Sequence, residues 1–163
     1  QLLTDLFKGR EAQLAGFKQQ MTGLMAEQGL AYGDRTKTYN SRLAQELGCW
    51  ADTQANGDEF HKQLYRAYFV DNLNISDPEL LVSLVEKTDL DSAEARKVLA
   101  QRTFSEQIDQ DWSRAHSFGV TGVPTFVSAG LSVVGCQPYE LLTRFANHLK
   151  DLKLDVVNEG DDA

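Results

Sequence analysis

The chain has 163 residues, of which 42% are hydrophobic and 9% aromatic. This length suffices for one domain with a hydrophobic core, and this composition excludes a disordered segment. Sixteen basic and 24 acidic residues give a net charge of −8, which argues against nucleic acid or an anionic membrane surface as a partner. No apolar run approaches the roughly 20 residues that a membrane-spanning helix needs, so we also expect no membrane insertion.

The chain opens on Gln1 without a methionine, and no signal-peptide pattern follows. We therefore expect that the beginning of the protein is missing from this sequence.

Residues 1–118 are predicted to form a mainly helical domain. Apolar residues from Phe7 onward recur at helical spacing, and Gly29 is suited to end that helix. After a polar loop over residues 31–38, Asn40 is a good N-cap for the next helix.

Two later segments carry the signature of a helix start. Ser76 precedes Pro78 and Glu79, which is typical of an N-cap followed by a first-turn proline and a capping box. Asp91 begins a similar signature. The apolar side chains of the predicted helices are expected in the core: Leu43, Leu47, Trp50, Ala51, Phe60, Leu64, Tyr65, Ala67, Tyr68, Phe69, Leu80, Leu81, Leu84, Val85, Phe104, Ile108, Trp112 and Ala115.

Beyond residue 119 the pattern changes from helix to strand. Residues 125–128 and 131–134 are rich in β-formers and are separated by Ala129-Gly130, which predicts a hairpin. Pro138 then opens a last helix, so residues 119–150 form a ββα part. Residues 151–163 hold five acidic residues and one lysine, and we predict a solvated acidic tail there.

The chain contains two cysteines, Cys49 and Cys136, which are too few for a disulfide scaffold and match no metal-binding spacing. We expect them to be unbonded to each other and to reside in a reducing, cytoplasmic compartment. The three histidines, His61, His116 and His148, lie in predicted helices and are expected to be ordinary helix residues. We predict no metal and no cofactor.

One segment has a specific pattern: Gly-Val-Thr-Gly-Val-Pro-Thr-Phe-Val at residues 119–127, followed by Gly-Cys-Gln-Pro-Tyr-Glu at residues 135–140. It resembles the signature of the DsbA-like thioredoxin superfamily, especially its FrnE-like branch. The stretches YNSRLA, LYRAYF and DPELL follow the order of matching stretches in that family, and the resemblance covers about residues 3–149. The resemblance implies an α/β, thioredoxin-like fold of the DsbA type with a large inserted helical domain.

The resemblance also implies roles for single residues. Pro124 would be the family's cis-proline, and Val123 would pair its backbone with a bound protein or peptide thiol or disulfide substrate, with Thr125 beside it. The family's first strand and its Cys-x-x-Cys motif would lie before Gln1, as part of a βαβ segment absent from this chain. Cys136 stands where the family usually has alanine.

The resemblance implies a thiol–disulfide oxidoreductase that here lacks the redox Cys-x-x-Cys. Two alternatives remain: an enzyme like the kappa-class glutathione transferases and 2-hydroxychromene-2-carboxylate isomerases, or a non-catalytic thioredoxin-like binding module. Gly135-Cys136-Gln137-Pro138 favours the disulfide branch. Because a lone hairpin has open edges, we also expect a homodimer in which two chains complete one another, with the acidic tail outside the contact.

Overall fold

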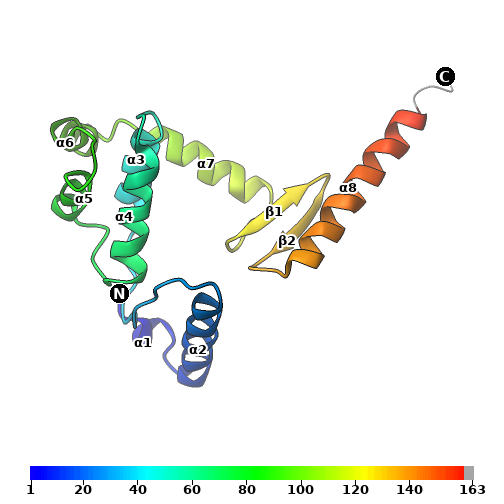
Figure 1. The fold of residues 1–163 in the computed structure, drawn as a ribbon, viewed down its shortest axis with the longest axis horizontal. Helices are drawn as coiled ribbons and strands as arrows, with labels where there is room; N and C mark the ends of the chain where they lie inside the picture. The colour runs from blue at the N-terminus through cyan, green and yellow to red at the C-terminus, as the bar shows by residue number, and fades with distance from the viewer. Residues whose placement is uncertain (160–163) are drawn as a thin grey trace. The chain divides into compact units, whose positions relative to one another are not determined.

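The computed structural model describes the backbone of residues 1–159 and the side chains of residues 1–150. The chain forms two compact units, Gln1–Asp109 and Gln110–Ala163. The elements, coloured from blue to red along the chain in Figure 1, are α1 (Leu3–Leu6), α2 (Glu11–Glu27), α3 (Arg42–Ala51), α4 (Gly57–Phe69), α5 (Pro78–Val85), α6 (Ser92–Gln101), α7 (Ser105–Ser117), β1 (Thr125–Ser128), β2 (Leu131–Val134) and α8 (Tyr139–Glu159).

The N-terminal segment forms two helices, and the prediction of one helix running from Phe7 was wrong. Phe7 is the C-cap of α1, and Gly9 adopts a φ of +77° in the turn before α2. Gly29 ends α2 as expected: its N–H donates to Ala26, and the N–H of Leu30 donates to Met25, which together form a Schellman motif.

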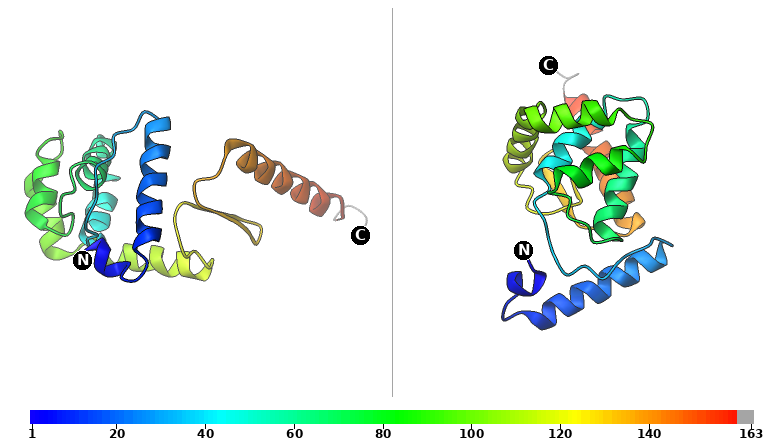
Figure 2. Two further views of the ribbon diagram at one scale, coloured as in Figure 1. Left: turned by 90° about the horizontal axis from the view of Figure 1, so that it is seen from below. Right: turned by 90° about the vertical axis from the view of Figure 1, so that its left-hand side faces the viewer.

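The core of the first unit lies among α3, α4, α5 and α6, which Figures 1 and 2 show gathered into one bundle. The helical spacing places Leu47, Trp50 and Phe60 in this core, as the sequence predicts. Two predicted core residues are instead exposed, Tyr65 and Trp112. Both follow the helical spacing of their neighbours, but the core does not extend to them.

The structure corrects the predicted N-cap residue at two helix starts and confirms it at a third. Asp77, not Ser76, is the N-cap of α5, and its carboxylate accepts from the N–H of Glu79 at 3.0 Å. With Asp77 in that position, Pro78 falls at the start of the helix, where no N–H is needed. Asp91 caps α6 by accepting from two backbone N–H groups, as expected. Before α3 the N-cap position is Ser41, although Asn40 Oδ1 accepts from the N–H of Arg42 at 2.8 Å.

A buried carboxylate links α3 to the residue after α6. Glu46 is 1% exposed and lies between two arginines. Its Oε1 accepts from Arg42 Nε at 2.6 Å and from Arg102 Nη2 at 2.7 Å, and its Oε2 accepts from Arg102 Nε at 2.6 Å. Arg42 also reaches Asp109 and the carbonyl of Ser105. The pairing compensates the cost of burying the charge of Glu46.

The second unit contains most of α7, the antiparallel hairpin β1–β2 and α8. Both strands and the start of α8 lie where the sequence predicts them. Within residues 110–150 every described side chain is at least partly exposed, so this unit has no closed core in the described structure. Among the described residues no helix is long and apolar enough to cross a bilayer. The backbone of α8 continues to Glu159, whereas the side chains of the predicted acidic tail lie outside the described residues.

Candidate functional site

The candidate site begins where α7 ends. Gly119 has a φ of +68°, its N–H donates to His116, and the N–H of Val120 donates to Ala115. These bonds form a second Schellman motif, which a glycine accommodates without steric cost. The chain therefore leaves α7 in a defined direction and enters the loop that contains Val123 and Pro124.

The structure brings together the two halves of the sequence signature. The N–H of Gly135 donates to the carbonyl of Pro124 at 2.8 Å, which joins the residue before β1 to the residue after β2 at the open end of the hairpin. Thr125 Oγ1 donates to the carbonyl of Gly122 at 2.6 Å and closes the turn around the proline. The Val123–Pro124 peptide bond is cis, as the sequence analysis expects.

Ala129 and Gly130 form the two-residue turn of the hairpin. Both residues have positive φ, +49° and +75°, as in the type I′ turn that suits a two-residue hairpin loop. The register pairs Thr125 with Val134 and Phe126 with Val133. Glycine adopts this conformation freely, whereas alanine adopts it at a steric cost.

The register also determines which backbone groups face away from the partner strand. In an antiparallel pair, hydrogen-bonded and non-hydrogen-bonded residue pairs alternate. Because Pro124 and Gly135 are hydrogen-bonded, the N–H and C=O of Thr125 and Val127 point to the outer edge of β1, opposite β2. By the same alternation, the backbone groups of Ser132 and Val134 point to the outer edge of β2.

The two outer edges differ. The side-chain amide of Gln137 donates to the carbonyl of Val134 at 2.8 Å, so one acceptor on the outer edge of β2 is already bonded. On the outer edge of β1, no backbone bond to Thr125 or Val127 is seen within the described part of the chain. In the sequence, Gln137 stands out only as part of a motif, because a glutamine side chain gives no signal of which carbonyl it will reach.

The segment around the proline carries no charge and exposes an apolar side chain. Val123 is 89% exposed and immediately precedes Pro124 at the start of β1. Residues 119–138 contain no charged residue, so the recognition groups available there are backbone N–H and C=O groups and uncharged side chains. Such a surface can pair with an extended peptide by strand addition.

The cysteines and histidines are not gathered into a site. Neither Cys49 on α3 nor Cys136 after β2 takes part in a disulfide, which confirms that they are not bonded to each other. His61 Nε2 lies 2.7 Å from Asp52 Oδ1 within the helical unit. Among the described residues, no cluster of three or more histidine, cysteine or acidic side chains is arranged to hold a metal ion.

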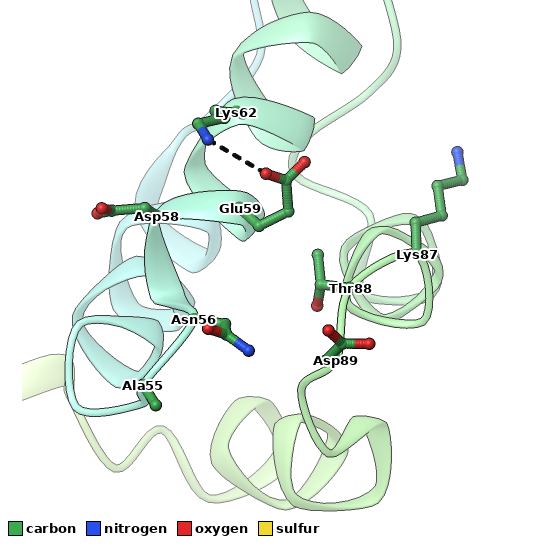
Figure 3. A pocket seen from close by; sticks show the side chains of 8 residues that line it. All are labelled: Ala55, Asn56, Asp58, Glu59, Lys62, Lys87, Thr88 and Asp89. Atoms are coloured by element: carbon green, nitrogen blue, oxygen red, sulfur yellow. Dashed lines mark hydrogen bonds and ion pairs between the residues drawn. The ribbon is translucent and has the colours of Figure 1, made fainter.

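A cavity of about 400 Å³ lies in the helical unit between the start of α4 and the turn after α5. Figure 3 shows side chains of both charges around it, with Lys62 bonded to Glu59 at 3.2 Å. Hydrogen bonds from Gln63 and Lys62 hold the pKa of Glu59 below its ordinary value. No residue of the 119–140 signature lines this cavity, so its mixed polar lining does not define the site.

The fold and the turn at Pro124 define a thioredoxin-like protein of the DsbA type with a helical domain. Residues 5–146 match the family of DSBA-like thioredoxin domains, and the chain belongs to this family.

Two proteins illustrate the similarity. The crystal structure of the probable DsbA oxidoreductase SCO1869 from Streptomyces coelicolor superposes with a TM-score of 0.78 at 29% identity, over 93% of this chain and 68% of that chain. The uncharacterized protein YwbO of Bacillus subtilis is 30% identical over 94 residues, which are 57% of this chain. The matched part spans 47% of YwbO, about half of that curated relative.

Proposed function

We propose that this chain carries the peptide-binding part of a thiol–disulfide oxidoreductase, in which Val123 offers its backbone to an extended substrate peptide. The observation that carries the proposal is the 89% exposure of Val123 at the start of an uncharged strand, in the segment that matches the family signature. The similarity to a probable DsbA oxidoreductase supports the same reaction class.

Peptide binding and disulfide exchange are separate tasks in such a protein. Exchange requires a thiolate to attack a disulfide sulfur and a second thiol to resolve the mixed disulfide. Residues 1–163 contain no Cys-x-x-Cys, and Cys49 and Cys136 lie on different units. The proposal therefore assigns these residues the binding of the peptide, with Val123, Pro124 and Thr125 as its contact segment. Both cysteines lie outside any disulfide, which fits a cytoplasmic location.

The binding role can be tested with a short fluorescein-labelled peptide that has an apolar, extended sequence and one S-methylated cysteine. Val123→Pro removes the N–H that would pair with the peptide, whereas the control Val123→Thr keeps both the N–H and the β-branched shape. We expect Val123→Pro to weaken binding about 10-fold, as for the loss of one hydrogen bond, and Val123→Thr to bind like the wild type. Equal binding by all three proteins, or binding of glutathione in preference to the peptide, would contradict the proposal.

A second assay separates binding from catalysis. The chain should reduce insulin with dithiothreitol no faster than the background reaction, because its cysteines do not form a redox motif. Activity that persists in the double variant Cys49→Ala/Cys136→Ala would assign the chain a chemistry that does not use its thiols.

A further inference from the structure

We propose that Arg35 anchors a binding site for a small organic carboxylate, in a pocket between α2 and the loop that follows it. The inference is independent of the function proposed for Val123, because every residue that it uses lies in the helical unit Gln1–Asp109. Three features of that unit support it: a fixed arginine, the lack of an acidic partner for this arginine, and a neighbouring pocket with several hydrogen-bond donors.

The loop that carries Arg35 is fixed against the end of α4. The N–H of Gly33 donates to the carbonyl of Phe69 at 2.9 Å, and the N–H of Arg35 donates to the carbonyl of Gly33 at 3.0 Å. A Cβ atom at residue 33 would lie 2.1 Å from the carbonyl oxygen of Val70, so only glycine allows this close approach. The backbone of Arg35 is therefore held in place independently of its side chain.

Two aromatic rings hold the guanidinium of Arg35. Its central carbon lies 4.3 Å from the centre of the Tyr68 ring and 5.4 Å from the centre of the Phe69 ring. The hydroxyl of Tyr68 is 3.4 Å from Thr38 Oγ1, which helps to fix that ring. A guanidinium stacked on a ring keeps its N–H groups directed outward in its own plane, so they remain available to an acceptor.

The guanidinium of Arg35 has no acidic partner. Its Nε is shielded from water without a hydrogen-bond partner, and the group forms no ion pair among the described side chains of residues 1–150. By contrast, Arg42, Arg66, Arg96 and Arg102 each lie 2.6–3.6 Å from a carboxylate oxygen. Because a shielded donor without an acceptor is costly, a carboxylate beside Arg35 would supply what the fold leaves out.

A pocket of about 280 Å³ lies beside this arginine. Its lining comes from α2 and the following loop: Lys18, Thr22, Tyr32, Gly33, Asp34 and Arg35. The ammonium of Lys18 and the hydroxyls of Thr22 and Tyr32 add donors to those of the guanidinium. All of these residues lie within positions 18–35, so one short stretch of the chain builds the pocket.

The charge of the pocket favours a ligand with a single negative charge. Lys18 Nζ lies 2.5 Å from Asp34 Oδ1, so these two charges compensate each other and the charge of Arg35 is left over. The pocket is thus positive, although the whole chain has a net charge of −8. A carboxylate carries one charge on two coplanar oxygens, and this geometry matches two parallel N–H groups of a guanidinium. We therefore assign the pocket to a carboxylate rather than to phosphate.

The first test is isothermal titration calorimetry of the full chain with benzoate, a planar molecule with one carboxylate. Benzamide has nearly the same shape without the charge, and it serves as the control ligand. We expect benzoate to bind at one site, benzamide not to bind, and inorganic phosphate to bind more weakly than benzoate. The absence of benzoate binding, equal binding of benzoate and benzamide, or phosphate binding as tight as that of benzoate would overturn the proposal.

A matched pair of variants separates the site from the overall charge. Arg35→Gln and the control Arg66→Gln each remove one positive charge, and Arg66 is a surface residue of α4 with a side chain that is 64% exposed. We expect Arg35→Gln to weaken benzoate binding about 10- to 100-fold, as for the loss of a charge-assisted hydrogen bond, and Arg66→Gln to bind like the wild type. Arg35→Lys keeps the charge without the paired N–H groups, and it should also bind more weakly. Equal losses in Arg35→Gln and Arg66→Gln would show that only net charge matters and would overturn the proposal.

Nuclear magnetic resonance of the ¹⁵N-labelled wild type provides a readout that needs no variant. Benzoate should shift the Nε–H resonance of Arg35 and the backbone amide resonance of Gly33, and both shifts should saturate with the affinity found by calorimetry. The Nε–H resonance of Arg66 should stay in place. Shifts confined to residues outside positions 18–35 and the end of α4 would place the carboxylate elsewhere and contradict the assignment to Arg35.

Discussion

Replacing Glu46 by glutamine should destabilise the helical unit, because this substitution removes a buried charge and leaves the shape nearly unchanged. The carboxylate accepts from Arg42 and Arg102 at 2.6–2.7 Å. Glutamine keeps one acceptor oxygen, but its amide nitrogen would replace an oxygen that now accepts from an arginine. At least one charge-assisted bond becomes a contact between two donors, and the others lose their ionic character.

The expected loss follows from these bonds. A hydrogen bond to a charged group contributes about 1.5–3 kcal/mol, and Arg102 is partly in water, so we expect Glu46→Gln to lower the free energy of unfolding by about 2–3 kcal/mol. For a chain of this length, that corresponds to a decrease in Tm of about 5–10 °C. Urea unfolding can be followed by tryptophan fluorescence, because Trp50 is buried on the same helix whereas Trp112 is already exposed in the folded chain.

A control on the surface isolates the effect of burial. Glu79 accepts from Arg96 at 2.8 Å through both oxygens, but its side chain is 72% exposed. Glu79→Gln should therefore change the free energy of unfolding by less than about 0.5 kcal/mol. Equal effects of the two substitutions would refute the argument that burial makes the Glu46 pairing important.

The pH dependence gives a second check on Glu46. Hydrogen bonds from Arg102 and Arg42 lower the pKa of Glu46 from its ordinary value of 4.5, although burial opposes them. A lowered folded-state pKa contributes stability that is complete above the unfolded value and is lost as the pH falls through the folded value. The difference between wild type and Glu46→Gln should therefore be full at pH 7 and shrink below about pH 4.5. A difference that grows on acidification would contradict this sign.

Two further predictions concern the hairpin and the thiols. Ala129→Gly should stabilise the hairpin by about 0.5–1 kcal/mol, since alanine at a φ of +49° is strained, whereas Gly130→Ala should destabilise it by about the same amount; both are measurable by thermal unfolding. Thiol titration should count two thiols in denaturant without reductant, and in the native protein the exposed Cys136 should react before the half-buried Cys49. Equal native reaction rates would contradict the difference in exposure.

Local chemistry made much of this fold predictable. The apolar spacing of residues 43–51 placed Leu47 and Trp50 in the core, and Ala129-Gly130 between two β-rich segments defined the hairpin at its observed bounds. The signature around Pro124 indicated the family, which the match over residues 5–146 confirmed. Which of several neighbouring polar residues takes the N-cap position was harder to predict. Ser76 was expected to cap α5, but Asp77 occupies that position.

The sequence by itself determined the periodic and turn features, because these depend on residues a few positions apart. Only the tertiary structure decided that Glu46 is buried, since its second arginine, Arg102, is 56 positions away. The tertiary structure likewise decided that Gln137 bonds to the carbonyl of Val134. A side chain's partner across the fold depends on how the chain brings distant segments together, and residue order alone does not encode that contact in any short pattern.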